Sequence, residues 1–363
     1  MRAPQAETPR TVLITGGAGF IGANLANRLA QAGHHVVVYD ALTRPGVAAN
    51  LSWLQASHPD RITAVVADIR DADRIAQCVA DVEAVFHLAA QVAVTTSLDA
   101  PMTDFAVNLG GTLNLLEALR IRGGRVPLLF ASTNKVYGNL HDLDLTAEGG
   151  SYLPSDPALR RWGIDEDRPL DFHTPYGCSK GGADQYVLDY ARSYAVPSVV
   201  MRMSCIYGPR QMGTEDQGWV AHFLIRALEG RPISIYGDGR QVRDILHVTD
   251  AVDAYLAAWA RIDQLAGRAF NLGGGPANAV SLRQVVAQIE TLTGRLVDLR
   301  FADWRAGDQR YYVSDMRRAA AALGLAKQRP WQDGLADLAR WLVEARGTDQ
   351  SPGVAASMMG AAE

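Results

Sequence analysis

Short apolar runs alternate with helical periodicities over the first two hundred residues of the chain. Between the first two runs, Ile21, Leu25 and Leu29 recur at the spacing of one helix face. Apolar strands are predicted at 11–15, 36–39, 62–66, 84–88, 127–131 and 196–201. Strands that alternate with helices in this way are typical of a parallel sheet with helices on both faces. The predicted fold class is therefore α/β, with a Rossmann-type doubly wound parallel sheet.

After residue 202 the pattern changes to shorter segments. A strand is predicted at 233–235, and helices are predicted near 220–228, 250–260, 282–292 and 333–344. We expect the sheet domain to span 11–202, with segments that return to it from about 243–272. Residues 203–346 are expected to form mainly a smaller C-terminal α/β domain. Residues 1–10 and 347–363 are poor in large apolar side chains and are expected to be loose tails.

A glycine-rich turn joins the first predicted strand to the first predicted helix. It reads Gly16-Gly17-Ala18-Gly19-Phe20-Ile21-Gly22. Glycines allow a tight turn and let the backbone approach a pyrophosphate, which the N–H groups of the helix N-terminus then bind. The second strand ends at Asp40, whose carboxylate is expected to bond ribose hydroxyls and to repel a 2′-phosphate. The sequence therefore predicts NAD, and not NADP, as the cofactor.

Further cofactor contacts are expected where later strands end. Small side chains after the fourth strand would let the diphosphate and a ribose lie close to the backbone. His87 lies inside that apolar strand, and we interpret it as packed core and not as a metal ligand or catalyst. The contacts expected here are Asp68 and Ile69 near the adenine, then Leu88, Ala89, Ala90, Gln91 and, on the following helix, Asn108.

The main catalytic candidate is the helical turn Tyr176-Gly177-Cys178-Ser179-Lys180. A phenol and an ammonium four residues apart lie on the same face of a helix. We expect the lysine cation to favour the phenolate and to lower the tyrosine pKa from its ordinary value of about 10. Such a pair can take a proton from an alcohol while a neighbouring group accepts a hydride. The chain has three lysines and 32 arginines, so a chance Tyr-x-x-x-Lys is uncommon.

Charge and cysteine content limit the partners of the protein. The net charge is −4 with no basic cluster, which argues against nucleic acid as a partner. Cys78, Cys178 and Cys205 are scattered and odd in number, which fits reduced thiols and a cytoplasmic location. No Cys/His cluster has metal-ligand spacing, so no metal is expected. No apolar run reaches membrane-spanning length and the N-terminus lacks a signal-peptide pattern, so no membrane association is expected.

Taken together, these motifs resemble a known family. The glycine turn, Asp40, Thr133 at the end of the fifth strand and the Tyr176–Lys180 turn are similar to those of extended short-chain dehydrogenases/reductases that act on nucleotide sugars. The resemblance covers nearly the whole chain except the tails. It implies that the sheet domain binds NAD and that the smaller domain binds the nucleotide-sugar substrate. A homo-oligomer, dimer or tetramer, is expected.

One segment distinguishes the reactions that members of this family catalyse. The 4,6-dehydratases place an Asp-Glu pair after the threonine, whereas this chain has Asn134 and Lys135. A neutral amide and a cation cannot replace those carboxylates, so dehydration is disfavoured. UDP-galactose 4-epimerases carry a lysine where this chain has Val92. The CDP-paratose 2-epimerases (CDP-tyvelose epimerases) are the subgroup whose sequences are similar to this chain at 132–138, 171–180, 216–220 and 239–244.

The resemblance also implies residue roles. Tyr176 would be the base, Lys180 would tune it and hold the nicotinamide ribose, and Thr133 would donate a hydrogen bond to the sugar oxygen. Two arginines would clamp the diphosphate by bidentate hydrogen bonds. The implied substrate contacts are Thr133, Asn134, Gln217 and Trp219, the clamp residues Arg243 and Arg305, and Asp308 at the nucleotide ribose.

The function expected from these observations is NAD-dependent epimerisation of a nucleotide-diphosphate sugar at C2, through a transient keto-sugar. Three alternatives stay open. One is a UDP-sugar 4-epimerase of the UDP-glucose or UDP-glucuronate type; the others are a net nucleotide-sugar oxidoreductase and a non-catalytic NAD-sensing protein. The long polar stretch between Gly138 and Tyr176 is expected to form a lid or wall of the substrate site.

Overall fold

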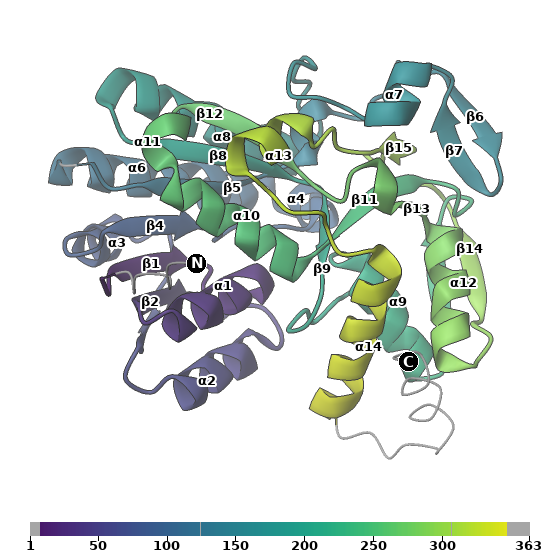
Figure 1. Ribbon diagram of the computed structural model, residues 1–363, viewed down its shortest axis with the longest axis horizontal. Helices are drawn as coiled ribbons and strands as arrows, with labels where there is room; N and C mark the ends of the chain where they lie inside the picture. The colour runs from purple at the N-terminus through teal and green to yellow at the C-terminus, as the bar shows by residue number, and fades with distance from the viewer. Residues whose placement is uncertain (1–7, 124, 306, 347–363) are drawn as a thin grey trace, which may run out of the picture.

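Seven parallel strands form the central sheet in a computed structural model that describes residues 8–123, 125–305 and 307–346 (Figure 1). Across the sheet the order is β12 (Arg268–Leu272), β8 (Ser198–Met203), β5 (Leu128–Thr133), β4 (Ala84–His87), β1 (Thr11–Thr15), β2 (His35–Asp40) and β3 (Ile62–Val66). From β1 the strands are added toward one edge of the sheet as far as β3, and from β4 they are added toward the opposite edge. Doubly wound sheets bind ligands at such a switch point, beyond the carboxyl ends of the strands. Thr15 pairs with Tyr39 on one side and with His87 on the other, so three strands end together there.

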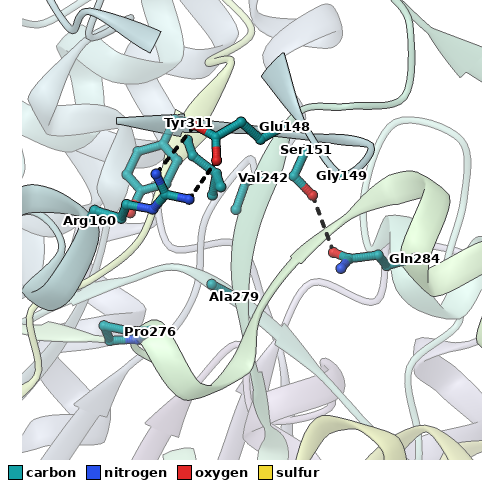
Figure 2. Close-up of a pocket in the computed structure, with 10 residues that line it drawn as sticks. Glu148, Gly149, Ser151, Arg160, Val242, Pro276, Ala279, Gln284 and Tyr311 are labelled. Atoms are coloured by element: carbon teal, nitrogen blue, oxygen red, sulfur yellow. Dashed lines mark hydrogen bonds and ion pairs between the residues drawn. The ribbon is translucent and has the colours of Figure 1, made fainter. Parts of the chain in front are cut away.

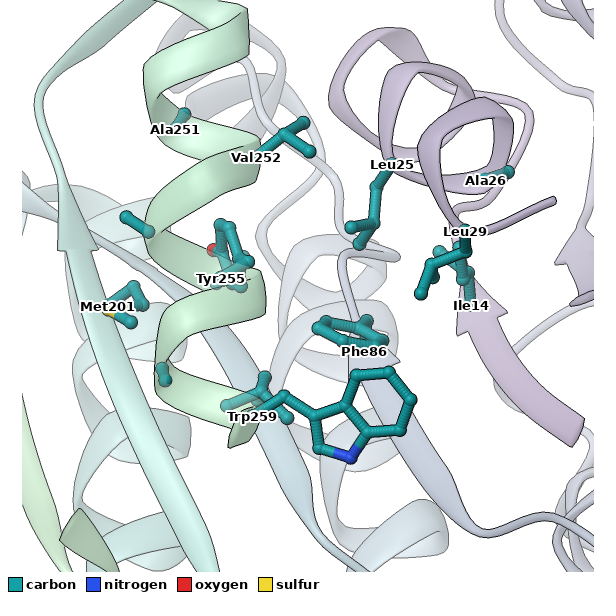
Figure 3. Close-up of a cluster of buried hydrophobic side chains, with 14 of the residues drawn as sticks. Ile14, Leu25, Ala26, Leu29, Phe86, Met201, Ala251, Val252, Tyr255 and Trp259 are labelled. Atoms are coloured by element: carbon teal, nitrogen blue, oxygen red, sulfur yellow. The ribbon is translucent and has the colours of Figure 1, made fainter. Parts of the chain in front are cut away.

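Helices cover one face of the sheet and form its larger apolar core. They are α1 (Phe20–Gln31), α2 (Val47–Ser57), α10 (Val248–Ala260), α11 (Ile262–Leu265) and α13 (Arg317–Leu323). Figure 3 shows Leu25 and Leu29 of α1 and the aromatic rings of α10 turned toward Phe86. The Trp259 ring meets Phe86 edge to face with centroids 5.8 Å apart. This packing explains why the strands are apolar on this face.

The opposite face carries the helix with the catalytic candidates. Its helices are α3 (Ala72–Val79), α4 (Val94–Asp99), α5 (Pro101–Phe105), α6 (Gly111–Arg122) and α8 (Thr174–Tyr194). A π-helical turn, η1 (Ala106–Gly110), joins α5 to α6. Helix α8 has Pro175 in its first turn, where the missing N–H costs nothing, and ends at Ala195 in the left-handed conformation. The first turns of α8 therefore present Tyr176 and Lys180 near the end of β5.

The smaller domain lies beside the carboxyl ends of the sheet strands (Figure 1). Its strands are β9 (Cys205–Tyr207), β11 (Val242–His247), β13 (Ala279–Ser281) and β15 (Tyr311–Tyr312), with β10 (Ile233–Tyr236) and β14 (Leu299–Ala302) as a separate pair. Its helices are α9 (Trp219–Leu228), α12 (Leu282–Thr293) and α14 (Trp331–Arg346). A second apolar core joins them, and it includes Ile245, Leu224 and Leu338.

The long polar stretch folds onto this smaller domain. After the 3₁₀ turn η2 (Asn134–Tyr137), it holds the hairpin of β6 (Leu145–Glu148) and β7 (Ser151–Pro154), and then α7 (Pro157–Trp162). Tyr152 donates its N–H to the Arg240 carbonyl at 2.9 Å and its hydroxyl to Asp238 at 2.7 Å. The hairpin is therefore fastened to the loop that leads into β11, and its role as a lid or wall stays a prediction.

The predicted fold class is confirmed, and several element bounds differ from the sequence pattern. Strand β5 extends through Ser132 and Thr133, where Thr133 pairs with Met203, because ladder hydrogen bonds continue past the last apolar residue. Arg10, assigned to a loose tail, is held by its N–H to His34 Nδ1 at 3.2 Å and by its guanidinium over Trp259. The tail predictions for residues 1–7 and 347–363 lie outside the described residues.

Candidate active site

The glycine turn between β1 and α1 is shaped by close backbone contacts. Gly16 has a φ of +70°, and a Cβ there would lie 2.7 Å from the Ala89 nitrogen. A Cβ on Gly22 would lie 2.2 Å from the Gly16 oxygen, so this position admits no side chain. At Gly19, by contrast, a Cβ would meet only the Gly16 oxygen, at 3.1 Å. The backbone is therefore open toward a ligand at Gly19, while Phe20, Ile21 and Gly22 form the helix turn beneath it.

Asp40 lies over the same turn. Its carboxylate accepts the Ala18 N–H at 3.1 Å and the Leu42 N–H at 2.9 Å. Burial raises the pKa of Asp40, and these hydrogen bonds partly oppose that shift. A carboxylate next to the glycine turn fits a ribose diol and repels a phosphate at that place.

The expected adenine contacts, Asp68 and Ile69, already interact with other residues of the chain. Arg70 forms a 2.6 Å ion pair with Asp68, and this hydrogen-bonded pairing lowers the pKa of Asp68. Tyr39 donates its hydroxyl to the Asp68 carbonyl at 2.6 Å. The Ile69 side chain is buried against Gly111, so only its backbone is available to a ligand.

The segment Leu88, Ala89, Ala90 and Gln91 continues from β4 beside the glycine turn. Leu88 donates its N–H to the Thr15 carbonyl at 2.9 Å. Asn108 accepts the Gln91 N–H at 2.8 Å and donates its amide back to the Gln91 carbonyl at 3.0 Å. Asn108 thus holds this segment through its backbone, from a π-helical turn of the kind often found at functional sites.

Thr133 and Tyr176 are brought together at the end of β5. The Thr133 hydroxyl lies next to the Tyr176 phenol and lowers its pKa. Burial acts in the opposite direction and is larger, and the Asp104 carboxylate adds to it, so the pKa of Tyr176 is raised to about 12. The expectation that Lys180 lowers this pKa is therefore wrong for the structure described here.

The reason lies in the contacts that Lys180 makes. Its side chain is 3% exposed, and its ammonium donates to the Ala131 carbonyl at 2.5 Å and lies 4.1 Å from the centre of the Phe130 ring. Burial lowers the pKa of Lys180 to about 7, against the opposing charges of Asp184 and Asp104. Lys180 is not among the groups that shift the Tyr176 pKa, and its ammonium donates its hydrogen bond to the Ala131 carbonyl and not to the phenol.

A buried network behind Lys180 was missed by sequence reasoning. Asp104 is fully buried, and it accepts the Ser179 hydroxyl at 2.5 Å, the Gln91 amide at 2.8 Å and the Asn108 amide at 3.1 Å. The network ties α5, the segment after β4 and the turn that carries Lys180 into one unit. Two signals were available: Asp104 precedes Asn108 by one helical turn, and Ser179 lies next to Lys180.

The two arginines of the predicted diphosphate clamp form ion pairs with carboxylates of their own chain. Arg243 on β11 forms a 2.6 Å ion pair with Asp308, so two predicted substrate residues meet. Arg305 lies 3.4 Å from Glu215 and 3.6 Å from Asp216, with its guanidinium 3.8 Å from the centre of the Tyr236 ring. Arg243 lies on a strand and Arg305 on a loop, and each already holds an anionic group.

The other predicted substrate residues have internal partners as well. The Asn134 amide donates to the Gln309 side chain at 3.1 Å, and Gln309 in turn donates to the Gly138 carbonyl at 2.6 Å. Trp219 begins α9 and donates its indole N–H to the Cys205 sulfur at 3.3 Å. Gln217 lies just before α9 in a turn closed by backbone hydrogen bonds with Thr214. Gln309, fully buried, was missed because nothing local in the sequence distinguishes it.

His87 is packed in the core, as interpreted. Its Nδ1 is 2.6 Å from the Thr15 hydroxyl and its Nε2 is 3.0 Å from the Thr112 hydroxyl. Burial, with a smaller effect of the Lys180 charge, lowers the pKa of His87 to about 3, so the ring is neutral. In the part of the chain that the structure describes, no group of three or more His, Cys, Asp or Glu residues is arranged to hold a metal, and no helix has the length and hydropathy of a membrane span.

A separate cavity of about 490 Å³ lies under the β6–β7 hairpin (Figure 2). Glu148 and Arg160 form a 2.7 Å ion pair at this cavity, and the Ser151 hydroxyl is 3.4 Å from the Gln284 side chain. None of the predicted site residues lines it. The cavity is therefore distinct from the region where Thr133 and Tyr176 meet.

Comparisons with known proteins place the chain among nucleotide-sugar enzymes. Residues 12–273 match the model of the NAD dependent epimerase/dehydratase family. The CDP-paratose 2-epimerase of Salmonella typhi is 41% identical, over 91% of this chain and 98% of that protein. A UDP-glucose 4-epimerase of Mycolicibacterium smegmatis is 36% identical, over 89% and 96%. The solved UDP-glucuronic acid 4-epimerase of Bacillus cereus with UDP-glucuronic acid and NAD aligns with a TM-score of 0.79 and 26% identity, covering 92% of this chain and 99% of that one.

Proposed function

Because this chain belongs to the NAD dependent epimerase/dehydratase family and is an NAD-dependent nucleotide-sugar epimerase, we propose that it inverts C2 of a CDP-linked sugar of the paratose/tyvelose type. The observation that carries redox epimerisation is the approach of Thr133 and Tyr176 to each other at the carboxyl end of β5. The choice of C2 is supported by the 2-epimerase that is 41% identical over nearly its whole length. Asn134 and Lys135, in place of a carboxylate pair, argue against dehydration.

The residues around the glycine turn fit NAD, which is the cofactor of the family. The open backbone at Gly19 suits a pyrophosphate, and the Asp40 carboxylate suits an unphosphorylated ribose. When bound, NAD would supply the hydride acceptor and donor that inversion of a sugar carbon needs. The remaining cofactor contacts we propose are Phe20, Ile21, Gly22, the Asp68 side chain, the Ile69 backbone, Leu88, Ala89, Ala90, Gln91, Asn108, Tyr176 and Lys180.

The chain's own residues handle the proton and the orientation of the sugar. Tyr176, as a phenolate, takes the proton of the ring hydroxyl whose carbon is oxidised, and it returns a proton when that carbon is reduced. Thr133 donates a hydrogen bond to the same sugar oxygen. With a pKa raised to about 12, Tyr176 needs a nearby cation, and the Lys180 ammonium one turn away supplies it when it leaves the Ala131 carbonyl.

The substrate diphosphate takes the place of carboxylates on the clamp. Phosphate oxygens replace Asp308 on Arg243, and they replace Glu215 and Asp216 on Arg305. Asp308, once released, is free to accept a hydrogen bond from the nucleotide ribose. Gln217 and Trp219 line the nucleotide or sugar pocket.

A second candidate, a UDP-sugar 4-epimerase, is favoured by the relative of that name that is 36% identical. The test incubates the protein with a panel of CDP- and UDP-sugars and identifies each product by NMR. A C2 epimer from a CDP-sugar supports the proposal, and a C4 epimer from a UDP-sugar establishes the second candidate. The Tyr176→Phe protein is the control for contaminating activity.

We also propose that the protein is a homo-oligomer, through apolar side chains exposed on α4, α5 and α8. Leu98, Met102, Phe105 and Tyr186 are 47%, 75%, 50% and 44% exposed on these mutually packed helices. Clustered exposed apolar residues of this size mark interaction surfaces. Sedimentation should give a dimer or tetramer for the wild type and a smaller species for Met102→Glu/Phe105→Glu. A wild-type monomer would contradict the proposal.

A further inference from the structure

Lys135 occupies a position between the two halves of the site. It follows Thr133 on the turn η2, and its N–H donates to the Thr133 hydroxyl at 3.2 Å. Its carbonyl faces Gly177, which would carry a Cβ only 3.5 Å away. The backbone of Lys135 thus contacts both the hydroxyl that meets Tyr176 and the turn that holds Tyr176.

The side chain of Lys135 reaches in the other direction, toward the clamp. Its ammonium donates to the Gly307 carbonyl at 3.0 Å, the residue before Asp308. The titratable groups whose charges act on it are Asp308, Arg243 and Cys205, and burial lowers the pKa of Lys135 to about 8. Lys135 is therefore a second cation beside the Arg243–Asp308 ion pair.

Such a placement is costly if Lys135 has only a structural role. A partly buried ammonium next to a guanidinium loses hydration and is repelled by that guanidinium, and the attraction of the Asp308 carboxylate offsets these costs only in part. An ammonium has three donor hydrogens, and within the described residues the Gly307 carbonyl is the one hydrogen-bond acceptor that Lys135 reaches. A neutral amide could bond that carbonyl as well. Two donors and a positive charge are left over for an anion.

We propose that Lys135 binds the phosphoryl group attached to C1 of the sugar and thereby sets the inverted carbon as C2. This inference rests on the proposed function and extends it to one residue. Arg243 holds the diphosphate from β11, while Lys135 holds it from the turn that carries Thr133. A phosphate anchored beside Thr133 keeps C2, the neighbour of C1, at Tyr176, whereas C4 lies across the ring. A carboxylate in the place of Lys135 would repel the same phosphate.

The test compares three variants by calorimetric titration of the NAD-loaded protein with CDP, with UDP and with cytidine. Lys135→Met removes the charge and the donors. Lys135→Gln removes the charge but keeps a donor for Gly307. Lys327→Met is the matched control, because Lys327 is an exposed lysine that takes part in none of these contacts. Thermal unfolding of each protein without nucleotide reports any structural damage.

Both Lys135 variants should bind the preferred nucleoside diphosphate about 10- to 100-fold more weakly than wild type, as expected for loss of one charge-assisted hydrogen bond. Their binding of cytidine, which has no phosphate, should be unchanged, and Lys327→Met should match wild type throughout. Lys135→Gln with wild-type diphosphate affinity would overturn the proposal and leave Lys135 as an anchor of Gly307. A weakened affinity for cytidine equal to that for CDP would also overturn it.

The result for Lys135 can be distinguished from the result for the proposed function. If wild type prefers UDP and forms C4 epimers, the proposed reaction is wrong, and the UDP titration still decides whether Lys135 binds phosphate. If wild type forms C2 epimers and Lys135→Met keeps wild-type kcat, KM and diphosphate affinity, the reaction stands and the role of Lys135 is refuted.

Discussion

The cofactor half and the substrate half of the site are built in different ways. Around the glycine turn the shape is fixed by backbone atoms, since Gly16 and Gly22 touch other backbone at distances that exclude a side chain. On the substrate side, Arg243 and Arg305 are held by carboxylates of their own chain. The first half is ready for its ligand, while the second must exchange ion-pair partners when the diphosphate binds. Cofactor affinity should therefore depend on shape and substrate affinity on charge.

Tyr176 lies where the two halves meet, and its replacement should have the largest effect. Tyr176→Phe keeps the ring and removes the oxygen that takes the proton, so kcat should fall by at least about 10²-fold, the low end of general-base contributions. NAD content and diphosphate affinity should stay at wild-type values. Steady-state kinetics and nucleotide release by acid measure both, and wild-type turnover in Tyr176→Phe would remove this residue as the base.

Replacement of Arg243 should damage the substrate half alone. Arg243→Gln loses a charged partner of the diphosphate, at a cost of about 1.5–3 kcal/mol, or roughly 10- to 150-fold in KM. The purified variant should contain as much NAD as wild type, because the glycine turn is untouched. Arg192→Gln, an exposed arginine on α8, is the control. Equal loss of NAD and of substrate affinity in Arg243→Gln would break the division between the halves.

A methyl group on the glycine turn should weaken the binding of NAD and leave the substrate half intact. Gly19→Ala would place a Cβ 3.1 Å from the Gly16 oxygen, a tight contact that a small shift relieves, so the free energy of unfolding of the nucleotide-free protein should change little. NAD affinity should weaken by about 1–3 kcal/mol, the range for forcing a carbon into filled space. Gly22→Ala, whose Cβ would lie 2.2 Å from the Gly16 oxygen, should instead destabilise the protein itself. Titration with NAD and urea unfolding separate the two cases, and unchanged NAD affinity in Gly19→Ala would refute the cofactor position.

The smallest effect is expected from Asp104, which acts through Ser179 and through its charge. Asp104→Asn weakens one hydrogen bond, worth about 0.5–1.5 kcal/mol, so activity should fall roughly 2- to 10-fold. Its negative charge raises the pKa of both Tyr176 and Lys180, so its removal should move the alkaline limb of the kcat/KM profile to lower pH. Asp189→Asn, an exposed aspartate on α8 that also accepts a serine hydroxyl, should leave the profile in place. A pH profile of Asp104→Asn identical to wild type would contradict its role.

Local patterns along the chain were predictable from the sequence, and contacts between distant segments were not. The glycine turn, Asp40 and the turn from Tyr176 to Lys180 are each local patterns, read within a few residues. The pairs Asp104–Ser179 and Arg243–Asp308 join residues 75 and 65 positions apart, and no local periodicity indicates such contacts. The same limit explains the error over the Tyr176 pKa: spacing places Lys180 on the right helix face, but burial and the Ala131 carbonyl come from the sheet beneath.

The central claim, inversion at C2 by removal and return of a hydride, is tested most directly by one NMR measurement of epimerisation in D₂O. The hydrogen on the inverted carbon should remain protium, because it does not exchange with water, while Tyr176 handles only the hydroxyl proton. The account predicts a product inverted at C2, with protium retained at C2 and with C4 unchanged. Inversion at C4, or deuterium at C2, would contradict it.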